Sequence, residues 1–352
     1  MNQHGGYRGD RQDMLDFSIN INPLGMPPRL PYDLEAAIAD LGRYPEPDGA
    51  AHKKRLAARL GVAPEQLILG NGGIDLIYLY TRSVGRGRPS AAVVVPTFNE
   101  YRLALAMNGW DPITLWETGA DSDFRIDSDA FTAMVGRTRP DAVFICNPNN
   151  PTGMAYSPAF LCGLMDRCDP AIHWFIDESF IDFSAKDSCR DLLAGERRLV
   201  LLRSLTKFFG IPGLRLGYAL GHPAIIRAME NDQMPWSVNA LALAALDTVF
   251  DDARFIADSK SYMAKERHRV YMGLERLDGL AVYPSSADFH LCRLESGTAA
   301  ALNARLNNRG INIRTCEDFT GLGEAYFRIA VKKKADNDRL LAALKEELDR
   351  WD

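Results

Sequence analysis

Three polar side chains stand where apolar segments of the chain end, and together their types can carry out one kind of chemistry. Apolar surroundings disfavour the charged form of a lysine, so the amine of Lys207 can form a Schiff base with an aldehyde. Asp177 can keep a pyridine nitrogen protonated, so that the ring accepts electrons from a breaking bond. Asn150 can donate a hydrogen bond to a ring oxygen, and Phe98 can stack on the ring face. These residues predict a site for a planar heteroaromatic aldehyde.

A second group of residues predicts a phosphate site beside the ring. In LGNGGIDLIYLY, Gly72 and Gly73 begin a helical pattern, where unpaired N–H groups and the helix dipole attract an anion. Ser204 and Thr206 add hydroxyl groups, and Arg215 adds a charged fork that binds phosphate oxygens. A ring that carries an aldehyde and a phosphate is therefore the expected ligand.

Each of these features has a more ordinary explanation when it is taken alone. A glycine cluster before a helix is most often a turn, and an aspartate after a strand is usually a cap or turn residue. A lysine is usually a solvated surface residue, and NPNNPTG can be only a stiff turn. The hypothesis depends on finding all of them together, each at the end of an apolar segment.

Short apolar segments that alternate with helical patterns are expected to position these side chains. Uninterrupted apolar strands spaced by helices indicate an α/β fold with a mostly parallel sheet covered on both faces. Ligands of such sheets bind beyond the carboxyl ends of the strands, so we expect Asn150, Asp177 and Lys207 to converge on one crevice. The segments are AAVVVP (91–96), AVFIC (142–146), IHWFID (172–177), LVLLRS (199–204) and LGYAL (216–220).

The pattern changes beyond about residue 235, where a long helical stretch is followed by short strands and a closing helix. This order predicts a smaller α+β domain beside the large one. We expect residues 1–42 to form an N-terminal arm and part of the small domain, 43–235 the large domain, and 236–352 a linking helix and the C-terminal small domain.

Composition excludes several classes of function. The 352 residues carry a net charge of −5, which gives no reason to expect a nucleic-acid partner. No apolar run is long enough for a membrane span, and the start has no apolar core of a signal peptide. The six cysteines lack the spacing of a zinc site or a disulfide framework, so we expect reduced thiols and no metal. The sequence predicts a cytoplasmic protein that acts on a small molecule.

The combination of NPNNPTG, DESF and SLTKFFGIPGLRLGY resembles the signature of the fold-type I pyridoxal-phosphate (PLP) enzymes of the aspartate aminotransferase superfamily. Within it, the HGG arm, LDFSININPLG and QMPWSVNAL are most similar to the threonine-phosphate decarboxylases of cobalamin biosynthesis, near relatives of the histidinol-phosphate aminotransferases. The resemblance implies a PLP-dependent carboxy-lyase with Lys207 as its Schiff-base lysine, Asp177 as the pyridinium partner and Asn150 as the partner of the phenolate oxygen. It implies Phe98 as the stacking ring, and Gly72, Gly73, Ser204 and Arg215 as ligands of the cofactor phosphate.

The resemblance also implies residues on the substrate side and a second subunit. Tyr44 would reach the cofactor phosphate from the neighbouring subunit, which makes a homodimer with its active site at the interface the expected assembly. Arg328 matches the superfamily's carboxylate-binding arginine. The candidates for the rest of a phosphorylated amino acid, its phosphate included, are His4, Gly5, Gly6, Asn20 and Arg314.

One residue departs from the aminotransferase pattern. Where those enzymes usually carry a tyrosine three residues after the aspartate, this chain has Phe180, as the decarboxylases do. The expected reaction is therefore decarboxylation of L-threonine O-3-phosphate, for which the N-terminal arm and Arg314 would hold the substrate phosphate and turn the carboxylate out of the ring plane.

Four other functions compete with this one, and the sequence argues against the last two. Decarboxylation of L-serine O-phosphate differs by one methyl group, which is worth only about 1–3 kcal/mol. A histidinol-phosphate-type aminotransferase would consume 2-oxoglutarate. A PLP-sensing regulator needs a fused DNA-binding domain, for which the expected 40 or so residues before the core leave no room, and a dinucleotide oxidoreductase needs a GxGxxG motif that GNGG does not supply.

Overall fold

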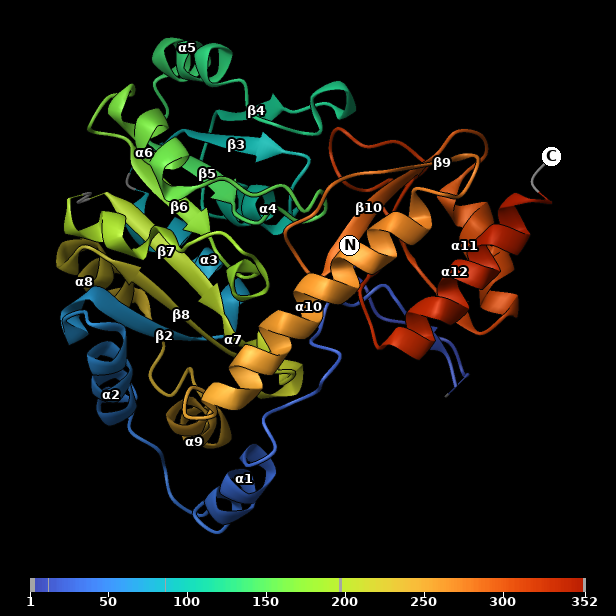
Figure 1. Cartoon of the computed structure of the whole chain (residues 1–352). Helices are drawn as coiled ribbons and strands as arrows, with labels where there is room; N and C mark the ends of the chain where they lie inside the picture. Colours follow the sequence, from blue (N-terminus) through green and yellow to red (C-terminus); the bar gives the residue numbers. More distant parts are fainter. Residues whose placement is uncertain (1–3, 12, 86, 196–197, 351–352) are drawn as a thin grey trace.

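The computed structural model describes residues 4–11, 13–85, 87–195 and 198–350. Among them, seven strands form the main sheet in the spatial order β2-β8-β7-β6-β5-β3-β4 (Figure 1). Only β8 runs antiparallel to its neighbours within this described sheet, which confirms the predicted mostly parallel sheet. The strands are β2 (Leu67–Asn71), β3 (Ala91–Val95), β4 (Ile113–Glu117), β5 (Ala142–Cys146), β6 (His173–Asp177), β7 (Leu199–Ser204) and β8 (Leu216–Gly221).

Alternating side chains of the strands divide the core into two layers. In β5, Val143 and Ile145 pack into one apolar cluster, and Phe144 and Cys146 pack into the other. Burial on both faces explains why the segment is apolar throughout, and each large side chain buried here contributes roughly 1.5–3 kcal/mol. The cluster of Phe144 is covered by α3 (Gly73–Val84), α4 (Glu100–Met107) and α8 (Pro223–Asp232), and the other by α2 (Ala50–Leu60), α5 (Ser128–Thr138), α6 (Pro158–Asp166) and α9 (Ala240–Thr248).

Further helical segments connect these elements. Two of them are α-helical, α1 (Leu30–Ile38) and α7 (Leu205–Phe208), and the others are single 3₁₀ segments at Pro64–Gln66, Ala120–Ser122, Ile181–Phe183, Cys189–Ala194 and Pro212–Leu214. Within the described ranges, no helix combines the length and the apolar character needed to cross a membrane.

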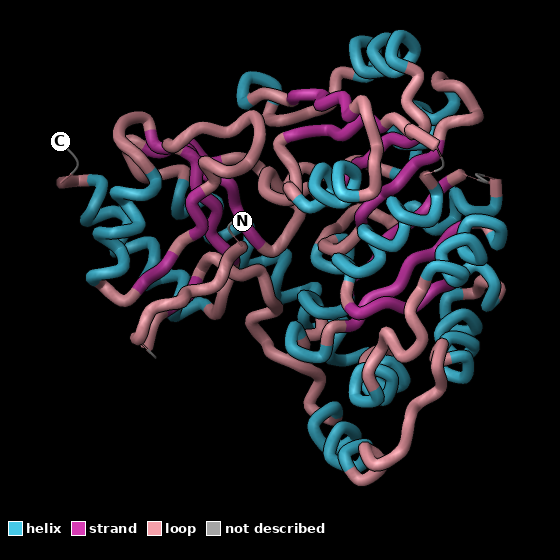
Figure 2. The backbone as a smooth tube through the Cα atoms, turned by 180° about the vertical axis from the view of Figure 1, so that it is seen from behind, coloured by secondary structure: helices cyan, strands magenta, loops and turns pink. Residues whose placement is uncertain are grey.

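A smaller antiparallel sheet lies beside the main one, in the order β12-β13-β10-β9. The N-terminal β1 pairs in parallel with β11, so the start of the chain lies against this part before it runs to α1 (Figure 2). We call β9 to α12, together with β1, the small-sheet part; the exact limits at 42 and 235 stay a prediction. Its elements are β1 (Leu15–Asp16), β9 (Leu280–Val282), β10 (Phe289–Leu294), α11 (Ala299–Asn308), β11 (Ile311–Asn312), β12 (Arg314–Thr315), β13 (Tyr326–Ala330) and α12 (Lys334–Leu348).

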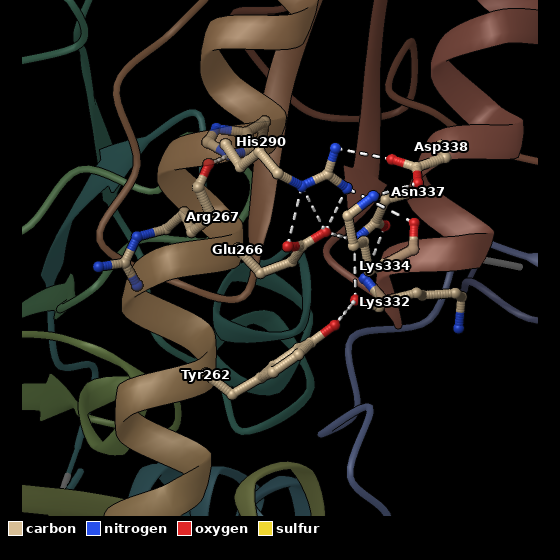
Figure 3. A network of polar contacts seen from close by, with 9 residues as sticks. Tyr262, Glu266, Arg267, His290, Lys332, Lys334, Asn337 and Asp338 are labelled. Atoms are coloured by element: carbon tan, nitrogen blue, oxygen red, sulfur yellow. Dashed lines mark hydrogen bonds and ion pairs between the residues drawn. The ribbon is translucent and has the colours of Figure 1, made fainter.

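The long helix α10 (Ala253–Leu274) runs between the two parts, and polar contacts fix it to the small-sheet part (Figures 1 and 3). The Glu266 carboxylate accepts hydrogen bonds from Arg269 Nε at 3.0 Å and from Asn337 Nδ2 at 2.8 Å. The Tyr262 hydroxyl donates to the backbone carbonyl of Lys332 at 3.1 Å. These contacts hold the end of β13 and the start of α12 in place, which matters because β13 carries a site residue.

Candidate active site

A cavity of about 380 Å³ lies at the carboxyl ends of the main-sheet strands. Lys207, Asp177 and Asn150 all line it, which confirms the predicted convergence. The strand order changes direction between β3 and β5, and such a switch point leaves a crevice outside the strand ends. Residues that follow β3, β5, β6 and β7 therefore meet there although they are far apart in the sequence.

Lys207 is held in an apolar wall of the cavity. It follows β7 within the single turn of α7, where its Nζ donates to Ser204 Oγ at 3.0 Å and lies 5.2 Å from the centre of the Phe180 ring. Burial lowers the pKa of Lys207, and the nearby Asp177 carboxylate opposes that shift. A lower pKa increases the fraction of free amine, which is the form that attacks an aldehyde.

Asp177 is buried and oriented by two donors. Its Oδ2 accepts from the Tyr101 hydroxyl at 2.7 Å, and its Oδ1 accepts from the Ser179 backbone N–H at 2.8 Å. Burial and the Asp177 carboxylate raise the pKa of Tyr101 far above its usual value, so Tyr101 stays a donor. The carboxylate is thus fixed at the end of β6, where it can accept a further hydrogen bond, for example from a ring N–H.

Asn150 faces the small-sheet part through its carbonyl oxygen. Its Oδ1 accepts a hydrogen bond from Arg328 Nη1. Since this contact occupies the oxygen, the NH₂ group is the end of Asn150 that can donate to a ligand. The predicted role of Asn150 as a donor is compatible with this geometry.

The predicted phosphate site is a close-fitting cradle. Gly72 has φ 80° and caps α3, and a Cβ atom at this position would clash with the Arg215 guanidinium. Gly73 begins α3, and the Ser204 and Thr206 hydroxyls lie 2.9 Å apart beside it in the cavity wall. Helix N–H groups, hydroxyls and a guanidinium are the donors that a phosphate needs, so these residues fit a phosphate-bearing ring such as PLP.

Two arginines face each other directly across the pairing of β12 with β13. Arg314 and Arg328 are both buried and both line the cavity. Arg328 Nη2 donates to the Ser18 carbonyl at 2.8 Å, and Arg328 forms no ion pair with any described residue. Burial lowers the pKa of Arg328 to about 10, which leaves it cationic at neutral pH. Arg314 is paired with the Asp318 carboxylate at 2.7 Å, whereas Arg328 has no such partner among the described residues, so this buried guanidinium can bind an anionic ligand.

The N-terminal arm lies over one side of the cavity. His4 Nε2 is 3.3 Å from the Glu100 carboxylate at the start of α4. Gly5 packs so closely on the Ser18 carbonyl that a side chain would clash with it, and the Gly6 N–H donates to Ser18 Oγ at 2.7 Å. The contact of His4 with substrate stays a prediction. Because His4 pairs with Glu100, such a contact requires the pair to separate or the imidazole to contact both groups at once.

Of the residues that the sequence predicts for the site, Gly6, Gly72 and Tyr44 do not line the cavity, and the others do. Asn20 places a buried Oδ1 there without a hydrogen-bond partner among the described residues. Tyr44 is 87% exposed and packs on Trp236, with ring centres 5.4 Å apart. Its role in a neighbouring subunit stays a prediction.

Sequence reasoning missed several residues that complete the site. Tyr101 lies three positions after Phe98, and its place in a helical turn beyond β3 was the available signal. Ser18 and Asp318 gave no signal, because their contacts with the two arginines depend on how the small-sheet part folds.

Asp288, which sequence reasoning also missed, carries a buried carboxyl group and directly precedes β10. It is fully buried, and neither of its oxygens has a hydrogen-bond partner among the described residues. Burial raises its pKa to about 7, although the positive charges of Arg328, Lys207 and Lys332 oppose the shift. Between about pH 4 and pH 7, the Asp288 carboxyl group therefore holds a proton in the folded protein but is ionised in the unfolded chain.

Replacing Asp288 with asparagine should stabilise the protein increasingly as the pH rises from 4 to 8. The pKa of the unfolded group is near 3.8, about three below the folded value, so ionisation costs the folded protein on the order of 4 kcal/mol above pH 7. Below pH 4 the carboxyl is protonated in both states and this cost vanishes. Urea unfolding across this range measures the difference; exposed Asp278→Asn is the control, and parallel pH curves for Asp288→Asn and the parent would contradict the prediction.

Comparisons with known proteins show the family to which this chain belongs. The family model for aminotransferase class I and II matches residues 12–344. A threonine-phosphate decarboxylase of Salmonella typhimurium is 36% identical over 95% of this chain and 91% of its own length. Histidinol-phosphate aminotransferase 1 of Thiobacillus denitrificans is 33% identical over 96% of this chain and 86% of its own length. The crystal structure of the histidinol-phosphate aminotransferase from Clostridium acetobutylicum is 29% identical, with a TM-score of 0.88 over 96% of this chain and all of that one. The chain therefore belongs to the class I and II aminotransferase family, whose fold-type I enzymes bind PLP.

Proposed function

We propose that the protein uses PLP to decarboxylate L-threonine O-3-phosphate, which gives (R)-1-amino-2-propanol O-2-phosphate and CO₂. The observation that carries the proposal is the pair of buried arginines, Arg314 and Arg328, that face each other in the cavity wall. This pair comes from β12 and β13, whereas the cradle comes from other elements, so the pair can serve a substrate with two anionic groups of its own. The Salmonella relative at 36% identity supports the same substrate.

The described residues fit the cofactor as follows. The cradle at the start of α3 and Arg215 would hold its phosphate, Asp177 its ring nitrogen and Asn150 its ring oxygen. When bound, PLP supplies an aldehyde for an amine and a ring that accepts the electrons of a broken Cα bond. Lys207, with its lowered pKa, provides the amine that holds the cofactor and can later carry a proton.

The cavity wall determines which bond of the substrate breaks. The bond at Cα that stands perpendicular to the ring overlaps its π system, so orientation selects the reaction. Arg314 would hold the substrate phosphate, and this grip at a distance would turn the carboxylate out of the ring plane. Phe180 places an apolar ring beside Lys207 where a tyrosine would add a hydroxyl donor, a difference that also supports decarboxylation.

Incubation of the PLP-loaded protein with L-threonine O-3-phosphate tests the proposal directly. We expect one CO₂ for each amino acid consumed and no requirement for 2-oxoglutarate. L-Threonine without the phosphate should react far more slowly, because it lacks the group that orients the carboxylate. L-Serine O-phosphate measures the contribution of the methyl group. Loss of the amino acid without an equal amount of CO₂ would refute decarboxylation.

Amino transfer to 2-oxoglutarate from a phosphorylated amine such as histidinol phosphate is the second candidate. The Thiobacillus relative, 33% identical, and the Clostridium structure, with a TM-score of 0.88, favour it, since both are histidinol-phosphate aminotransferases. The same assay separates the two reactions, because only the aminotransferase consumes 2-oxoglutarate in proportion to the amine.

The proposal includes a second copy of the chain. Tyr44 is strongly exposed and does not line its own cavity, and Tyr32, Ile38 and Leu41 of the same segment are also exposed. An apolar face of this kind supports pairing with another copy. If Tyr44 of one copy completes the other copy's phosphate site, the specific CO₂ release in the assay above falls when the protein is diluted until the pair separates.

A further inference from the structure

Asp318 lies in the loop between β12 and β13 and contacts a cavity arginine. Arg314 Nη2 donates to Asp318 Oδ2 at 2.7 Å, and the guanidinium carbon of Arg314 lies 5.1 Å from the centre of the Phe319 ring. A carboxylate on one side and an aromatic face beside it leave a long side chain little freedom. Arg314 is therefore held in one orientation by the residues that follow it in the sequence.

The same aspartate reaches across to the main-sheet part. Asn99, which precedes α4, donates through Nδ2 to the Asp318 backbone carbonyl at 2.9 Å and is 3.4 Å from Asp318 Oδ2. Asn99, Arg314 and Phe319 all line the cavity. Asp318 thus ties the wall formed by the small-sheet part to the wall formed by the start of α4.

The charge of Asp318 also offsets a repulsion within the wall. Arg314 stands directly opposite Arg328 in the β12–β13 pairing, and both guanidinium groups are buried. Two like charges in such a position repel each other. The Asp318 carboxylate, 2.7 Å from Arg314 Nη2, counteracts this repulsion, so we expect Arg314 to be held less firmly when that charge is removed.

We propose that Asp318 is a positioning residue that aims Arg314 at the substrate phosphate and anchors it, through Asn99, across the cavity. Asp318 itself does not line the cavity, so it would act through Arg314. The assignment of the anion at Arg314 as a phosphate rests on the proposed function; the positioning of Arg314 does not.

Calorimetric titration of inorganic phosphate into the PLP-loaded protein tests this inference without turnover. The cofactor fills its own phosphate cradle, so added phosphate reports on the remaining anion site. Asp318→Ala should weaken phosphate binding about tenfold or more, because a misplaced guanidinium no longer meets its ligand. Glu317→Gln is the matched control, since it removes one negative charge from the exposed neighbouring residue and should leave the affinity unchanged.

Two further variants separate positioning from folding. Asp318→Asn keeps the size and an acceptor oxygen, so it should fold like the parent and still weaken phosphate binding through the lost charge. Asn99→Ala should weaken binding less, and the double variant with Asp318→Ala should be no worse than Asp318→Ala alone, because both act through one contact. With L-threonine O-3-phosphate, KM should rise and kcat should fall, because the grip of Arg314 on the phosphate both binds the substrate and orients its carboxylate.

The inference is overturned if Asp318→Ala and Asp318→Asn bind phosphate as tightly as the Glu317→Gln control, or if the parent binds no phosphate. In either case CO₂ release by the parent would leave the proposed function standing. Conversely, weakened phosphate binding in the two Asp318 variants supports the inference even if no CO₂ is released.

Discussion

Lys207→Ala should lose both turnover and the visible absorbance of the lysine-bound cofactor. The Nζ of Lys207 is the amine in the cavity wall that follows β7, and burial lowers its pKa, which increases the fraction of the reactive free amine. Without it, the protein has neither the covalent hold on the aldehyde nor a nearby group to carry the proton, and we expect a fall in kcat of roughly 10³-fold or more.

Spectroscopy and kinetics on the same sample check this prediction. Lys260→Ala is the control, because Lys260 is an exposed lysine on α10 and its loss should change neither the spectrum nor the rate. PLP should still bind to Lys207→Ala without the covalent bond, through the cradle at Gly73 and Arg215. A Lys207→Ala protein that kept the absorbance of a lysine-bound aldehyde would show that another lysine carries the cofactor.

Asp177→Asn should reduce kcat by roughly 10²- to 10³-fold while the fold stays intact. Asparagine has nearly the same shape, and its oxygen can still accept a hydrogen bond from Tyr101 or Ser179. The substitution removes only the negative charge that would keep the ring nitrogen protonated. The loss therefore measures the charge of Asp177, not its packing.

Two comparisons make the Asp177 result interpretable. Tyr101→Phe removes one donor to the carboxylate but leaves the charge, so it should cost far less activity than Asp177→Asn. A cofactor analogue with a permanently charged ring nitrogen should restore much of the activity of Asp177→Asn. If Asp177→Asn retained more than a tenth of the parent activity, the ring-nitrogen role of Asp177 would be wrong.

The sequence predicts the site residues carried by the main sheet well, because each of them comes at or shortly after the end of an apolar strand. An apolar strand followed directly by a polar residue places that residue at one known edge of a parallel sheet, so the pattern alone brings Asn150, Asp177 and Lys207 together. The antiparallel direction of β8 was not predicted, because an apolar run such as LGYAL has no direction in itself.

The small-sheet part was harder to predict because its contacts depend on register. Arg314 and Arg328 face each other only because β12 pairs with β13 in one alignment, and nothing in INIRTC or YFRIAV fixes that alignment. The sequence did not predict roles for Asp318 and Asp288, because an aspartate in a loop or beside a strand has the pattern of an ordinary turn residue. Their burial and their neighbours come from tertiary packing.

The pairing of β1 with β11 joins two segments that are synthesised far apart in time. Leu15 leaves the ribosome long before its partner Ile311. The N-terminal arm therefore stays unpaired while all the strands of the main sheet are synthesised, since contacts between such distant residues form late. Because Ser18, three residues after Leu15, accepts a hydrogen bond from Arg328, the pocket acquires its final shape only after β13 has also been made.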